Sequence, residues 1–142
     1  MSKLYPVKVT PGGTIYLGMP EHLTLLEDFM IVDLNEDNIQ KYIAIINKAL
    51  ELGEEGIISG NTTTLSIKKE KTEVYNSSID IECTIDTVEL KEIIKIYLKE
   101  SLVNNIIINI KRMQSALERA QNVESISEIL EIKQNLNRKD II

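Results

Sequence analysis

The sequence predicts an α+β fold, in which an antiparallel sheet of about five or six strands carries two helices on one face and is followed by a C-terminal helical hairpin. Several short segments before residue 87 alternate apolar and polar residues, as half-buried strands do. Longer segments repeat apolar residues every three or four positions, the spacing of one buried helix face. These patterns divide the 142 residues into an α+β domain at 1–100 and a C-terminal helical extension at 101–142, packed on the same domain.

The first predicted element is a β-hairpin. Apolar residues in 4–9 precede the turn signal Pro11-Gly12-Gly13, where proline sets φ and glycine permits unusual backbone angles, and 14–18 forms the returning strand. The segment 22–34 follows, with 29–32 as its most strand-like part.

A helix is predicted over 35–52. Asn35 is the expected N-cap and Gly53 the expected terminator. Its buried stripe comprises Ile39, Tyr42, Ile43, Ile46, Ala49 and Leu50.

A meander of strands is predicted next, over 62–68, 72–75 and 79–85, with a turn before it at Gly60-Asn61. The strand 79–85 has the clearest pattern, since three isoleucines and Cys83 alternate with polar residues. One of its faces is therefore expected to be buried and the other exposed.

A second core helix is expected from a capping-box-like start at 86–89 to about Lys99. Beyond residue 101 the apolar spacing predicts a helix to about residue 120, although the β-branched run 106–108 leaves a strand possible there. A further capping box at Ser125 predicts the last helix of the hairpin.

Composition excludes several classes of protein. With 22 acidic against 16 basic residues the net charge is −6, which argues against a nucleic-acid binder. No apolar run reaches the length of a membrane span, and the first residues lack the apolar stretch of a secretory signal, so a soluble cytoplasmic protein is expected. One cysteine and one histidine argue against a disulfide framework and a Cys/His zinc site.

No catalytic constellation stands out, so the chain is predicted not to be an enzyme and to need no cofactor. His22 is expected to be a surface residue, and Cys83 a buried, inert thiol on the inward face of its strand. The segment 33–38 is rich in oxygen ligands but lacks the glycine and the closing glutamate of a calcium loop.

Negative charge is concentrated in residues 21–55, which hold nine carboxylates against Lys41 and Lys48. This net −7 exceeds the charge of the whole chain, and the remainder sums to +1. Either this is a solvated face that maintains solubility, or it is a docking surface for a basic partner.

The order of features over about 14–100 resembles that of small bacterial immunity proteins, the cytoplasmic antitoxins against polymorphic toxins such as those of contact-dependent growth inhibition. The resemblance rests on a short strand and a second strand that ends in acids, from Leu26-Glu27-Asp28-Phe29 through Val32-Asp33-Leu34. It continues with the helix at 38–52, the Gly60-Asn61 turn before a strand with Leu65 and Ile67, and the passage from Cys83-Thr84-Ile85-Asp86 into the helix that begins Glu89-Leu90-Lys91-Glu92-Ile93-Ile94.

This resemblance implies an inhibitor that binds one cognate toxin domain, for example a nuclease with a basic site. Acidic side chains would then act as phosphate mimics or as partners of Lys and Arg. The expected partner-binding residues are Glu27, Asp28, Asp33, Glu36, Asp37, Glu51, Glu54 and Glu55. The main alternative is an adaptor or assembly subunit that uses its C-terminal helices for protein–protein interaction, including self-association. An enzyme with paired carboxylates is the remaining alternative.

Overall fold

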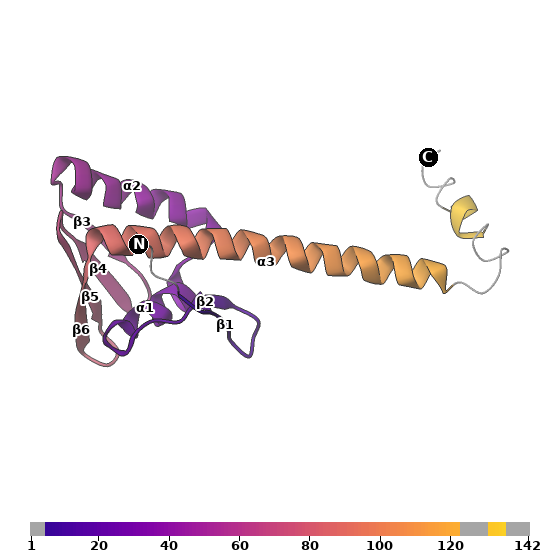
Figure 1. The fold of residues 1–142 in the computed structure, drawn as a ribbon, viewed down its shortest axis with the longest axis horizontal. Coiled ribbons are helices and arrows are strands. Elements are labelled where there is room, and N and C mark those ends of the chain that lie inside the picture. Colours follow the sequence, from indigo (N-terminus) through magenta and orange to yellow (C-terminus); the bar gives the residue numbers. More distant parts are fainter. Residues whose placement is uncertain (1–4, 123–130, 136–142) are drawn as a thin grey trace. The chain divides into compact units, whose positions relative to one another are not determined.

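A computed structural model describes residues 5–122 and 131–135 of the chain, which forms two units, 1–103 and 104–142 (Figure 1). The fold class is α+β, as predicted. In chain order the elements are β1 (Val7–Val9), β2 (Ile15–Leu17), the 3-10 helix η1 (Glu21–Leu23), α1 (Leu25–Asp28), the π-helical segment η2 (Phe29–Asp33), α2 (Glu36–Leu52), β3 (Gly56–Ser59), β4 (Thr63–Ile67), β5 (Lys71–Asn76), β6 (Ile81–Asp86) and α3 (Thr87–Gln121).

The described strands form two antiparallel sheets, one of two strands (β1-β2) and one of four in the order β3-β4-β5-β6. The predicted N-terminal hairpin is confirmed, with Val7 opposite Leu17. The prediction of a single sheet of five or six strands is wrong, because among the described residues no strand joins this hairpin to the meander. Strand β3, which pairs Ile58 with Leu65 of β4, was not predicted from its four-residue sequence.

The strand-like interpretation of 22–34 is also wrong, since this segment is helical in three short pieces. Of its six buried residues, four recur at intervals of three or four, namely Leu23, Leu26, Met30 and Leu34. That spacing lets a helical chain bury one side, and packing of this side outweighs the β propensity of Ile31 and Val32.

Helix α2 begins and ends where predicted. The Asn35 side chain accepts hydrogen bonds from the amides of Asp37 and Asn38, and the Asn38 side chain accepts one in return from the Asn35 amide at 3.0 Å. At the other end Gly53 adopts a φ of 69°, a left-handed conformation that glycine occupies without steric cost.

One face of the four-stranded sheet forms the core of the first unit. The central inward row pairs Ile58, Leu65, Val74 and Cys83 across the four strands, and three of these side chains are buried. Helix α2 contacts β3 and β4, α1 contacts β5, and η1 contacts β6. The opposite face has half-buried or exposed polar residues such as Glu73, so β4 and β5 alternate as predicted. In β6 only Ile85 of the predicted inward row is buried, so the prediction of a fully buried face over 79–85 is wrong for its first half, which lies at the edge of the sheet.

The chain from 87 to 121 is one continuous helix, α3, rather than the first half of a hairpin that starts anew at 101. It contains no glycine or proline, and its apolar spacing continues through 101, so nothing interrupts the backbone hydrogen bonds. The strand alternative for 106–108 is therefore wrong. The predicted start at Ser125 lies outside the described residues, and 131–135 are helical. Across the described ranges, no helix meets the length and apolarity needed to cross a membrane.

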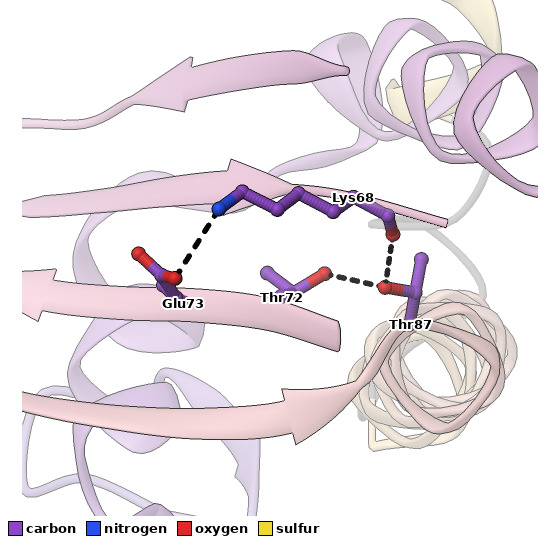
Figure 2. A network of polar contacts seen from close by, with 4 residues as sticks. All are labelled: Lys68, Thr72, Glu73 and Thr87. Atoms are coloured by element: carbon purple, nitrogen blue, oxygen red, sulfur yellow. Dashed lines mark hydrogen bonds and ion pairs between the residues drawn. The ribbon is translucent and has the colours of Figure 1, made fainter. Parts of the chain in front are cut away.

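Thr87 joins the sheet to α3 through a buried polar contact (Figure 2). Its amide donates to the Glu70 carbonyl at 3.0 Å, and its hydroxyl donates to the Lys68 carbonyl at 2.6 Å. The hydroxyls of Thr87 and Thr72 lie 2.9 Å apart. Because the single Thr87 hydroxyl proton is directed at Lys68, Thr72 is the donor in that pair.

We predict that Thr87→Val lowers the free energy of unfolding by about 1–3 kcal/mol, because the Lys68 carbonyl and the Thr72 hydroxyl lose their buried partner. Urea denaturation followed by circular dichroism measures the change. Thr87→Ser, which keeps the hydroxyl, and Thr84→Val at an exposed strand position should cost much less. Equal losses in all three variants would contradict this role.

Candidate functional site

The predicted partner-binding residues divide into three groups on the first unit. Two of the eight, Glu27 and Asp33, are half-buried. The six exposed ones are Asp28, Glu36, Asp37, Glu51, Glu54 and Glu55.

The first group lies at the N-terminal end of α2. Glu36 and Asp37 occupy its first turn, where carboxylates interact favourably with the positive end of the helix dipole. Burial raises the pKa of the Tyr97 phenol, and the negative charge of Glu36 raises it further. The Tyr97 hydroxyl donates to the Leu34 carbonyl at 3.3 Å, which holds this end of α2 against α3.

Asp33, just before this helix, has a structural role. Its Oδ1 accepts a hydrogen bond from the Asn61 amide at 2.8 Å, while its backbone carbonyl accepts one from the Asn38 side chain. Gly60 packs so closely on the carboxylate that an added Cβ would overlap it. The predicted Gly60-Asn61 turn is thus the place where the β3–β4 connection meets the helical segment.

The second group, Glu51, Glu54 and Glu55, lies at the opposite end of α2. With a rise of about 1.5 Å per residue, Glu36 and Glu51 are separated by about 22 Å along the helix. Lys41 and Lys48 lie on exposed positions between them. The structure therefore places the predicted acidic residues at two ends of one helix and does not gather them into a single cluster.

The third group comprises the neighbours Glu27 and Asp28 on α1, which have different roles. Glu27 accepts a hydrogen bond from the Met19 amide at 2.8 Å and so holds the chain that leaves β2. Asp28 is exposed and lines a groove between α1 and β6.

This groove, hereafter the β6 groove, has a volume of about 630 Å³. It is lined from η1 and α1 by Glu21, His22, Thr24, Leu25 and Asp28, and from β6 and the turn before it by Ile79, Ile81, Glu82, Cys83 and Thr84. Three carboxylates border it, whereas no lysine or arginine lines it. Ile79 and Ile81 are 54% and 52% exposed.

The alternation over 79–85 predicts that Ile79 and Ile81 lie on the inward face of one strand, whereas Ile79 lies in the turn before β6 and both residues are exposed. The alternating pattern shows which face a side chain takes, and it does not show that β6 is an edge strand. Ile85 of the same row is buried, so burial decreases along β6 toward the groove.

Cys83 and His22 both line the β6 groove. His22 is exposed, as predicted, and Cys83 is half-buried rather than fully buried. Desolvation raises the pKa of the Cys83 thiol, which keeps it protonated and makes it a poor nucleophile near neutral pH. In residues 5–122 and 131–135 no three His, Cys, Asp or Glu side chains are grouped as metal ligands would be.

Comparison with protein-family models, with curated proteins and with solved structures gives no match to this chain.

We predict that Cys83 of the folded chain reacts with iodoacetamide with a pH midpoint above that of the same chain unfolded in urea. The reason is that burial disfavours the thiolate, so the folded-state pKa is raised. Because the pKa of the thiol is higher in the folded than in the unfolded chain, keeping it neutral contributes to the free energy of unfolding. This contribution is fully present below the unfolded-state pKa and is lost as the pH rises through the folded-state pKa. Mass spectrometry of the single cysteine gives the rates. A folded midpoint at or below the unfolded one would contradict the effect.

Proposed function

We propose that this chain is an immunity protein that binds and neutralises a basic toxin domain, for example a nuclease, through its acidic surface. The observation that carries the proposal is the exposure of six carboxylates between residues 28 and 55, on α1 and at both ends of α2. An acidic inhibitor can cover a site built to hold phosphates, because carboxylates pair with the same Lys and Arg side chains.

The separation of the acidic groups is compatible with one interface. A standard interface buries about 800 Å² on each partner, which corresponds to a patch about 30 Å across. A patch of that size can include both ends of α2, which lie about 22 Å apart. It would also include Lys41 and Lys48, so the two ends need not contribute equally.

The proposal predicts that the chain co-purifies with the product of the adjacent gene and suppresses its toxicity. Glu36→Lys with Asp37→Lys, or Glu51→Lys with Glu54→Lys, should weaken the complex by about tenfold or more and reduce its salt sensitivity, because attractive pairs become repulsive. Surface plasmon resonance at two salt concentrations measures both effects.

The matched control is Glu118→Lys, a charge reversal at an exposed position of α3 outside this acidic surface. If no adjacent gene encodes a toxin-like domain, or if the control weakens binding as much as the α2 variants do, the proposal fails.

A second candidate function, an adaptor or assembly subunit, is favoured by the second unit. Its part of α3 has exposed apolar residues at alternating intervals of four and three: Ile106, Ile110, Met113 and Leu117. This is the spacing of a coiled-coil seam, so the helix suits pairing with another helix or with a copy of itself.

Under this alternative, Ile110→Glu with Leu117→Glu should convert an oligomer into a monomer in sedimentation velocity, since each charge would be buried in the seam. Ile108→Glu is the matched control, because residue 108 is exposed but outside the seam. A monomeric wild-type chain would rule out self-association through α3.

A further inference from the structure

We propose that the β6 groove binds an extended, basic segment of the partner protein, which adds as a strand to the free edge of β6. The inference deepens the proposed function and rests on it, because it identifies the part of the partner that the chain holds. Geometry, apolar surface and charge at the groove each support it.

The geometry places the groove along the edge of the sheet. Its lining includes four consecutive residues of β6, from Ile81 to Glu82, Cys83 and Thr84. Consecutive residues of a strand point to opposite faces, so a groove in contact with all four follows the strand edge. Among the described strands β6 pairs only with β5, and an extended chain can therefore extend this sheet by backbone hydrogen bonds.

The apolar floor supplies the second support. Ile79, in the turn before β6, and Ile81, on the inward side of β6, are about half exposed, and Leu25 of α1 lies on the opposite wall. Proteins often block strand addition with a charged side chain that points inward from an edge strand. Residues 81 and 83, which point inward here, are Ile and Cys and carry no such charge. Apolar side chains at alternate positions of an added strand would cover these isoleucines.

Charge selects the occupant. Glu21, Asp28 and Glu82 border the groove, and neither lysine nor arginine lines it. Lys or Arg at the alternate positions of the guest that share a face with Glu82 would therefore meet a carboxylate, and the carboxylates of Glu21 and Asp28 add to the negative potential of the groove. A second copy of the chain fits poorly, since it would bring these three carboxylates against their own equivalents. The opposite edge strand, β3, borders a hollow that contains Lys68, so it lacks the uniform charge of the β6 groove.

The test uses a fluorescent peptide of about eight residues that alternates lysine and valine, together with the full-length chain. We expect binding with a dissociation constant of about 10–100 μM, measured by fluorescence anisotropy, and a slower reaction of Cys83 with iodoacetamide when the peptide is bound. A peptide that alternates glutamate and valine should not bind. Two versions of the peptide carry N-methyl groups on alternate backbone nitrogens, one on the odd and one on the even positions. The version whose methyl groups replace the N–H donors that face β6 should not bind, whereas the other should bind like the parent peptide.

Variants then locate the site. Asp28→Asn with Glu82→Gln should weaken binding at least fivefold and lower its salt dependence, whereas Glu70→Gln, an exposed acid of the β4–β5 turn, should leave it unchanged. The inference is overturned if the peptide does not bind, if it binds without protecting Cys83, if both methylated registers bind like the parent, or if the groove variant binds like the control.

The peptide assay uses no product of the adjacent gene, so the two proposals can fail separately. If the chain neutralises that product while the groove variant retains full affinity for it, the proposed function stands and the groove assignment falls. If the peptide binds as expected but no toxin partner exists, the groove remains a strand-docking site and the immunity function falls.

Discussion

The junction at Thr87 is the constraint on which the arrangement of the first unit depends. Strand β6 ends at Asp86 and α3 begins at the next residue, so no loop lies between them that could change the direction of the helix relative to the strand. The three hydrogen bonds of Thr87 to the turn and strand at 68–72 set the point where the helix leaves the sheet. The first turns of α3 beyond this point bury residues spaced three or four apart on one side of the helix, namely Leu90, Ile93, Ile94 and Tyr97.

This arrangement determines which acidic residues remain available to a partner. Glu27 and Asp33 form hydrogen bonds to backbone amides of other segments, so part of the negative charge serves the fold. The six exposed carboxylates lie on α1, in the first turn of α2, and at or just beyond its C-terminal end. The β6 groove brings together two segments about 50 residues apart in the chain, and its charge comes from both of them.

Local signals were sufficient for much of the fold. The two ends of α2 could be predicted from Asn35 and Gly53, because capping is a property of a few adjacent residues. The alternation in 62–85 identified three strands of the meander. The segment 29–32 was mistaken for a strand because its β-branched residues dominate a short window, whereas helical burial is visible only from Leu23 to Leu34. Strand β3 has four residues, and its pairing with β4 identifies it more clearly than its own sequence does.

The sequence by itself determined the α+β class, the caps of α2, the faces of the strands and the position of the negative charge along the chain. These properties depend on neighbours within a few residues, or on counting. The tertiary structure alone decided that the strands form two sheets, that the acidic residues separate into groups, and that β6 is an edge with a groove beside it. Such features depend on contacts between segments far apart in the chain, which periodicity and composition do not encode.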